Sequence, residues 1–416
     1  MLRLHHLQAE PGMVIAMDVR HPRHHNIILL RPGAVLDRHA INHLHELKVR
    51  DLWIQYPSIA KIGATYNPEI ASASREITWR LGKAMDDYVA DRHAKLDYNM
   101  FRDAIAAMLD SLASSPKAAI YVMEAAEAAT PLVRHAANTC FLSMLLGLKL
   151  DFYLVRERGQ LSPSTAQDLT ALGAGAMMHD IGLLELPDEV LARYEETGDI
   201  ADSAWQEHTR LGFHSLRTDF EAAVGAIAYH HHQRYDGSGF PSRTMLDGRV
   251  VTPKGSEIHV FARIVAVADQ FDRLRFPGHT MLSPQRGEPA MPIVRALKQM
   301  ITPPMSQWFD PVILRTLLAA VPPFAPGSLV TLSDRRRALV SDWSPLDPCR
   351  PEVEIIPEAK GKWWENPPRE KLNLALEPTL SVAMCDEVDV SQDLFYPASV
   401  REFDSVKAQG ELRLAG

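Results

Sequence analysis

The middle of the chain carries hydrophobic residues at three- and four-residue steps, in segments 71–93, 98–113, 118–129 and 131–150. This spacing predicts amphipathic helices. Thr130 followed by Pro131 marks the start of the last segment, because a hydroxyl caps a helix and proline fits its first turn. No strand-like alternation follows before residue 325, so we predict one helical domain over residues 66–325.

The two flanking regions have different patterns. Short apolar runs at 12–19, 27–32 and 51–56 predict strands, and 37–48 predicts a helix, with Pro, Gly, His and Asn residues in the turns. Beyond residue 325, PPFAPGSLVTLSDRRRALVSDW alternates around a Ser-Asp turn, and RPEVEIIP predicts another strand. The expected fold is therefore mainly α, with a helical bundle between a small N-terminal α/β unit (1–64) and a β-rich C-terminal appendage (326–416).

Composition and charge fit a globular protein and narrow its partners. Of 416 residues, 46% are hydrophobic and 23% are charged, and the net charge is −8. This charge disfavours bulk nucleic acid and anionic membranes but leaves room for a local anion site. Three cysteines are too few for a disulfide framework. The most apolar stretch, 141–155, is too short and interrupted to span a bilayer, and the start lacks a secretory core. We expect a cytoplasmic protein.

The 18 histidines change this picture, because many fall among apolar residues. One apolar stripe at helical spacing comprises Leu169, Leu172, Ala176, His179 and Leu183. It predicts a helix that runs through Leu183 and buries His179. Asp180 lies about 100° round the same helix. A buried carboxylate needs a positive partner, and this stretch has no Lys or Arg. A metal ion would supply the charge.

Asp269 poses the same problem. It follows the apolar run VFARIVAVA, and Arg263, six positions back, lies about 240° away round the helix. We therefore expect Asp269 to lack a local cation. Further imidazoles lie on apolar faces at His135, at His208 and in the run His230, His231 and His232. Each is more often an ordinary core residue by itself, but five such segments together indicate a metal centre with nitrogen and oxygen donors.

The order of these motifs resembles the HD-GYP family, a branch of the HD-domain metal-dependent phosphohydrolases, over about residues 95–320. The motifs are His135, MMHDIGLLELP with His179 and Asp180, QEHTRLGFHSL with His208, HHQRYDGSGFP with His231 and His232, and RIVAVADQFDRL with Asp269. The resemblance implies an HD-type helical fold with two or three metal ions. It also implies hydrolysis of the bacterial second messenger cyclic di-GMP to linear pGpG or GMP.

The resemblance implies a ligand set as well. One metal would be held by His135, His179, Asp180 and Asp269, and a second by Asp180, His208, His231 and His232. Asp180 would bridge the two, His179 and Asp180 would be the catalytic pair, and a hydroxide between the metals would attack phosphorus. Five histidines with two carboxylates suit iron or manganese best, with zinc, cobalt or nickel as alternatives.

The implied substrate contacts are Asp236, Gly237, Gly239 and Arg275, and Gln233 would orient a neighbouring ligand histidine. Four positions depart from the family: Leu183 replaces a lysine, Gln233 a glutamate, Phe240 a tyrosine, and Pro131 an acid found in three-metal members. The last departure favours two metals. The first removes a cation that would contact the substrate phosphate, for which Arg234, Arg273 or Arg275 could compensate.

Three functions stay open on this basis. We favour an active cyclic di-GMP phosphodiesterase. The second is a metal-bound sensor or scaffold that binds the dinucleotide but barely cleaves it. The third is an HD phosphohydrolase that acts on another nucleotide, including other cyclic dinucleotides. The flanking units could regulate the helical domain or bind a second copy of the chain or a signalling protein.

Overall fold

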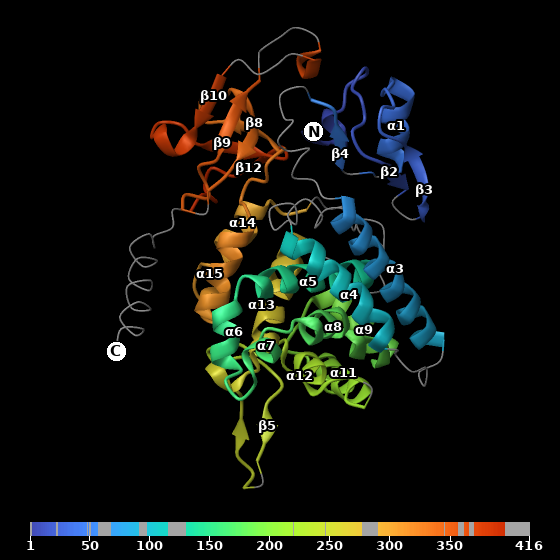
Figure 1. Ribbon diagram of the computed structural model, residues 1–416, viewed down its shortest axis with the longest axis vertical. Helices are drawn as coiled ribbons and strands as arrows, with labels where there is room; N and C mark the ends of the chain where they lie inside the picture. The colour runs from blue at the N-terminus through green and yellow to red at the C-terminus, as the bar shows by residue number, and fades with distance from the viewer. Residues whose placement is uncertain are drawn as a thin grey trace.

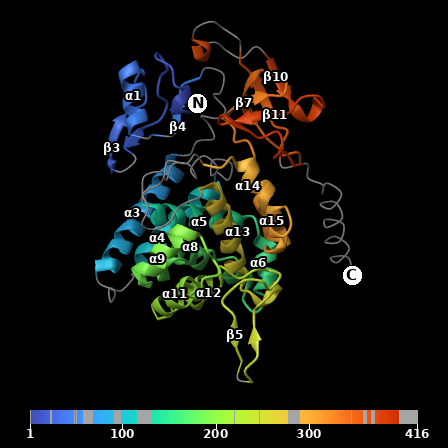
Figure 2. The same ribbon diagram turned by 180° about the vertical axis from the view of Figure 1, so that it is seen from behind.

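A computed structural model describes residues 2–395, apart from 22–23, 48, 50, 57–67, 91–97, 115–129, 219, 246, 277–289, 345, 357–361 and 366–369. Most of the described chain is a helical body, and the two flanking regions lie side by side at one end of it (Figures 1 and 2). The mainly helical fold predicted from the sequence is confirmed.

The helical body is built around α5, which is buried along nearly its whole length. Its helices are α3 (Pro68–Ala90), α4 (Tyr98–Ser114), α5 (Pro131–Leu148), α6 (Asp151–Glu157), α7 (Pro163–Ala166), α8 (Thr170–Met178), α9 (Asp188–Thr197), α10 (Ser203–Gln206), α11 (His208–Leu216), α12 (Ala222–His230), α13 (Val260–Arg275), α14 (Ile293–Met300) and α15 (Pro311–Ala320). Helices α8 and α13 pack against α5, and α12 packs against α8. The cap at Thr130 is confirmed, because its hydroxyl accepts a hydrogen bond from the Val133 amide.

Two predictions for this region are wrong. Helix α8 ends at Met178, and the chain continues from Asp180 into the 3₁₀ helix η3 (Ile181–Glu185), so no helix runs through Leu183. The tighter turn brings Gly182 against the backbone of α11, where a longer side chain has no room. Strands also occur before residue 325, since β5 (Arg243–Thr244) and β6 (Val250–Val251) form a projecting hairpin (Figure 1). Strands of two residues are too short to produce an alternating pattern. The predicted helix at 118–129 lies outside the described residues.

The C-terminal region forms one antiparallel sheet in the order β10-β9-β8-β7-β11-β12. Its strands are β7 (Leu329–Leu332), β8 (Arg337–Asp342), β9 (Glu352–Ile355), β10 (Glu370–Asn373), β11 (Val382–Cys385) and β12 (Val388–Asp389). The predicted hairpin around Ser333 and Asp334 is confirmed, with Leu329 opposite Leu339. The strand predicted in RPEVEIIP is β9.

The N-terminal region contains two small sheets, β1 with β4 and β2 with β3. Its elements are β1 (Leu2–His5), β2 (Val19–His21), β3 (His24–Leu30), α1 (Arg38–Glu46) and β4 (Asp51–Ile54). The strand predicted at 12–19 is wrong for most of its length, because Val14 and Ile15 make only isolated bridges and only Val19 belongs to a strand, as the first residue of β2. Strand β1 was not predicted.

The two flanking regions share one hydrophobic core. Leu2, Leu4 and Ile54 pack in the same cluster as Leu339 and Trp363. The Arg3 amide donates to the Gly327 carbonyl at 2.9 Å, and Arg3 forms a parallel bridge with Ser328. The N-terminal strands are therefore extended by a segment that follows the helical body in the sequence.

Membrane-spanning potential is slight in the part of the chain that the structure describes. No single helix there is long and apolar enough to cross a membrane, and only α5 and α6 together, bent by 90°, pass by length and composition.

Candidate metal centre

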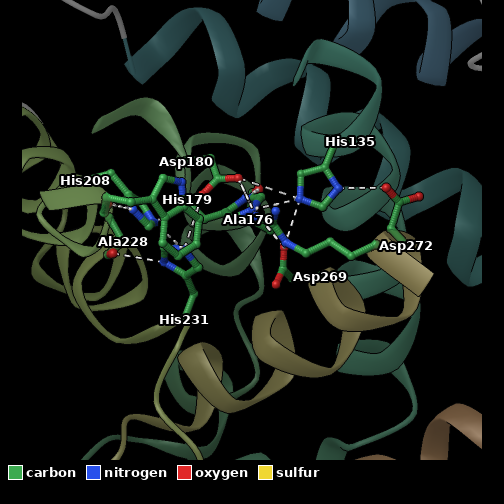
Figure 3. A network of polar contacts seen from close by, with 11 residues as sticks. His135, Ala176, His179, Asp180, His208, Ala228, His231, Asp269 and Asp272 are labelled. Carbon is green, nitrogen blue, oxygen red and sulfur yellow. Dashed lines mark hydrogen bonds and ion pairs between the residues drawn. The ribbon is translucent and has the colours of Figure 1, made fainter. Parts of the chain in front are cut away.

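The seven predicted metal ligands lie together at the centre of the helical body, and Figure 3 labels all of them except His232. They come from α5, from the end of α8, from the first residue of α11, from the loop after α12 and from α13. The first ligand group comprises His135, His179, Asp180 and Asp269, and the second comprises Asp180, His208, His231 and His232. Within each group the candidate donor atoms lie within 4.8 Å of one another. His230 is not part of either group, and its Nε2 pairs with Arg243 at 2.8 Å.

The first ligand group is tight. Asp269 Oδ1 lies 2.8 Å from His135 Nε2 and 3.5 Å from His179 Nε2. Asp180 Oδ2 lies 3.4 Å from His179 Nε2. Donors bound to one transition metal at about 2.0–2.2 Å are separated by distances of this order.

Asp180 also belongs to the second ligand group, through its other oxygen. Asp180 Oδ1 lies 3.3 Å from His231 Nε2 and 3.6 Å from His208 Nε2. One carboxylate thus presents one oxygen to each group, which is the arrangement of a bridging ligand.

The outer nitrogen of each of four histidines is held by a hydrogen bond. The Nδ1 atoms of His179, His208 and His231 donate to the carbonyls of Ala176, Trp205 and Ala228 at 2.7, 2.7 and 2.9 Å. His135 Nδ1 lies 2.7 Å from an Asp272 carboxylate oxygen (Figure 3). These bonds fix the tautomer that leaves the Nε2 lone pair for a metal.

Two buried atoms support the fit to a cation. His232 Nε2 and Asp180 Oδ1 have no hydrogen-bond partner among the described residues. Buried polar atoms without a partner are costly, and both belong to the second ligand group. A metal ion between them would satisfy both.

Burial and charge divide the histidines by protonation state. Burial opposes the charged form of His179, but the neighbouring Asp180 carboxylate outweighs it and raises the pKa of His179 to about 10. Burial lowers the pKa of His208 to about 3 and also lowers the pKa of His231 and His232. The second group therefore presents neutral imidazoles, the form that binds metals.

The prediction that Asp269 lacks a local cation is wrong, and the same arginine also pairs with Asp180. Arg273 Nε donates to Asp269 Oδ1 at 2.7 Å, and Arg273 Nη2 donates to Asp180 Oδ2 at 2.8 Å. Arg273 lies one helical turn after Asp269 on α13, on the same face. The cation partner of Asp269 follows it in the sequence, whereas the prediction considered only Arg263, which precedes it.

The residues expected to contact substrate have varied surroundings. Asp236 Oδ1 accepts hydrogen bonds from the Ser238 amide and hydroxyl, which closes the turn after α12. A Cβ on Gly239 would lie 2.4 Å from the His232 carbonyl oxygen, so glycine permits the close approach behind the ligand loop. Gly237 has a φ of +85°, a conformation that favours glycine. These residues shape the loop that carries His231 and His232.

Two other predicted site residues, Arg275 and Gln233, donate hydrogen bonds to backbone carbonyls. Arg275 donates to the Met291 carbonyl and lines neither cavity at the ligand groups. Gln233 Nε2 donates to the Pro241 carbonyl at 2.6 Å rather than to a ligand histidine. Its amide nitrogen therefore braces the loop, and an orienting role of Gln233 toward a ligand histidine stays a prediction.

Two cavities reach the ligand groups. The first is lined by His135 and Asp180 and the second by His231, His232 and Asp269. Tyr194, Trp205 and Arg273 line both. Tyr194 stacks on Trp205 with ring centroids 4.3 Å apart. The sequence did not indicate the stacked pair of Tyr194 and Trp205. The contacts of Asp272 and Arg273 could have been predicted only from their i, i+3 and i, i+4 spacing relative to Asp269.

Comparisons with known proteins agree with this site. The HD domain family matches residues 151–313. The chain is 24% identical over 369 residues to the cyclic di-GMP phosphodiesterase PA4108 of Pseudomonas aeruginosa, covering 80% of each chain. It is 36% identical over 111 residues to the cyclic di-GMP phosphodiesterase response regulator RpfG of Xanthomonas campestris, covering 26% of this chain and 27% of that one. It is 31% identical over 103 residues to the 3'3'-cGAMP-specific phosphodiesterase 2 of Vibrio cholerae, covering 23% and 17%.

The order of the motifs, the buried histidines and aspartates, and these relatives agree with one another. Residues 151–313 thus carry an HD domain, and the chain is similar to HD-domain proteins that are named cyclic di-GMP phosphodiesterases.

Proposed function

We propose that this protein is a metal-dependent phosphodiesterase that hydrolyses cyclic di-GMP to linear pGpG or GMP. The observation that carries the proposal is the Asp180 carboxylate, which presents one oxygen to each of two buried ligand groups. The relatives whose names include cyclic di-GMP phosphodiesterase support the substrate class.

The two ligand groups fit a pair of divalent cations, with His135, His179, Asp180 and Asp269 at one and Asp180, His208, His231 and His232 at the other. When bound, two such cations supply Lewis acidity that lowers the pKa of water and neutralises phosphate charge. Five imidazoles and two carboxylates favour iron or manganese, with zinc, cobalt or nickel as alternatives.

The chain's own residues then prepare the reaction. In the metal-free protein, the charges of His179 and Arg273 overcome burial and hold the pKa of Asp180 well below its usual value, so this carboxylate is ionised before a cation binds. The Trp205 and Tyr194 rings wall both cavities beside the ligand groups. Aromatic walls beside a charged centre suit a ligand that has flat bases and phosphates.

Two observations favour other functions of the same site. Leu183 lines the first cavity and supplies no charge there, which favours a sensor that binds the dinucleotide but barely cleaves it. Two relatives are named 3'3'-cGAMP-specific phosphodiesterases and are 31% identical over short stretches, which favours another cyclic dinucleotide as substrate.

A turnover assay separates these functions. Protein purified without oxygen is analysed for metals, loaded with Mn²⁺ or Fe²⁺, and incubated with cyclic di-GMP, 3'3'-cGAMP and a linear dinucleotide. We expect cyclic di-GMP to yield pGpG or GMP, and a chelator-treated sample to yield neither. Tight binding of cyclic di-GMP without product would identify a sensor, and product from 3'3'-cGAMP alone would identify the other hydrolase.

A further inference from the structure

Arg273 holds an unusual position for a positive charge, because it pairs with acids from both ligand groups. Its Nε and Nη2 donate to Asp269 and Asp180 at 2.7 and 2.8 Å. Both carboxylates are almost fully buried, at 4% and 2% exposed, whereas the Arg273 side chain is 24% exposed. A guanidinium has five N–H donors in a rigid fork, so these two bonds and a further one to Tyr194 leave others.

The remaining side of the guanidinium faces the cavities. Arg273 lines both of them, and no other Lys or Arg lines the first. Leu183 lies in that same cavity. Arg234 lines the second cavity only, where it covers the Trp308 ring at 3.6 Å. Arg273 is therefore the cation placed where an anionic group near Asp180 would lie.

We propose that Arg273 binds a non-bridging phosphate oxygen of the substrate, with Asp180 and Asp269 as the anchors that aim its guanidinium. The proposal rests on the proposed function, and it gives Arg273 the role of the cation that Leu183 does not supply. An arginine fixed at two of its donors loses little freedom when a third binds phosphate, and its planar fork matches phosphate oxygens.

The same geometry predicts an opposite effect on metals. Arg273 competes with any cation for the charge of Asp180 and Asp269, since it already pairs with both. Removing the guanidinium therefore weakens substrate binding but leaves metal affinity equal or higher. A residue that merely braces the ligand groups would affect both in the same direction.

The test compares Arg273→Ala and Arg273→Gln with the wild type, using Arg210→Ala as a matched control. Arg210 is 53% exposed and pairs with Glu207 on the surface of α11. Mn²⁺ affinity is measured by calorimetry without nucleotide, and kcat/KM for cyclic di-GMP is measured at saturating Mn²⁺. We expect both Arg273 variants to lose about 100-fold in kcat/KM with Mn²⁺ affinity unchanged or raised, and R210A to match the wild type.

A rescue variant makes the test sharper. Because residues 183 and 273 line the same cavity, Leu183→Lys in the Arg273→Ala background returns a cation from the other side. We expect it to recover at least about tenfold in kcat/KM.

Two results would overturn the proposal: kcat/KM of R273A and R273Q within threefold of wild type, or loss of Mn²⁺ from both variants. If R273A does not fold, R273Q decides. If the wild type hydrolyses nothing, the proposed function fails separately, and calorimetric affinity for cyclic di-GMP in the same variants still tests Arg273.

Discussion

Gly182 is the position where a single added methyl group tests how the two ligand groups are held together. A Cβ at this residue would lie 2.0 Å from the His208 carbonyl oxygen and 2.5 Å from the Gly212 amide nitrogen. Both neighbours are backbone atoms of α11, so neither can swing aside. Gly182 lies two residues after Asp180, and His208 belongs to the second ligand group.

The size of the effect follows from these distances. Ordinary contact begins near 3.4 Å, so Gly182→Ala requires the two backbones to separate by about 1.4 Å. Asp180 Oδ1 and His208 Nε2 are 3.6 Å apart before this change. Misplacing a reacting group by about 1 Å costs about 100-fold in rate, and overpacking of this kind costs about 1–3 kcal/mol of stability. We expect losses of this order in kcat/KM and in the free energy of unfolding.

Three measurements check the prediction: metal content by elemental analysis, kcat/KM on cyclic di-GMP, and urea denaturation. We expect Gly182→Ala to lose metal from the second ligand group. Gly82→Ala is the matched control. Gly82 lies within α3, and a Cβ there would be 3.9 Å from Val133, which is ordinary contact. The substitution should stabilise α3 by about 0.5–1 kcal/mol. A Gly182→Ala protein with two metals and a kcat/KM within threefold of wild type would refute the reasoning.

Three further predictions concern the ligands and their supports. Asp180→Ala should reduce the metal content from about two per chain to near none, and retention of two metals by elemental analysis would disprove the bridging role. Asp272→Ala frees the His135 Nδ1 that Asp272 holds at 2.7 Å; Mn²⁺ affinity should fall about 10- to 100-fold, and unchanged affinity in a titration would contradict this. The metal-free protein should be most stable near pH 6.5. Below that pH, His208 binds a proton in the unfolded chain but stays neutral in the folded protein, where its pKa is about 3, so stability decreases as the pH falls. Above it, folded His179, with a pKa of about 10, keeps a proton that the unfolded chain has released, and this stabilisation is lost as the pH approaches 10. Denaturation of chelator-treated protein across the pH range measures this, and stability that rises steadily to pH 10 would refute it.

The long, strongly periodic segments were predictable from sequence. Helices α3, α4 and α5 lie within a few residues of their predicted bounds, because an apolar stripe and a Thr-Pro start are local signals. The residues of the ligand groups were predicted from short motifs and from the order of those motifs, which resembles that of a known family, since each motif is local in the sequence.

What depends on tertiary contacts was not predictable. Arg273 and Arg275 are two positions apart on α13, so their side chains lie about 200° apart round the helix. Only the packing of α13 against α5 decides which one reaches Asp180. The shared core of the flanking regions could not be predicted from local sequence either, because Leu4 and Leu339, which belong to one cluster, are separated in the sequence by the whole helical body.

The bridge between Arg3 and Ser328 has a consequence for how the protein is made. About 325 residues separate the two positions, and ribosomes add roughly 5–20 residues per second. Strand β1, which pairs with β4 on one side, therefore leaves the ribosome roughly a quarter of a minute to a minute before Ser328 on its other side exists. During that time Leu2 and Leu4, which are buried in the finished protein, have no partner surface on β7 and β8, so the nascent chain presents an apolar segment to chaperones until translation has passed the helical body.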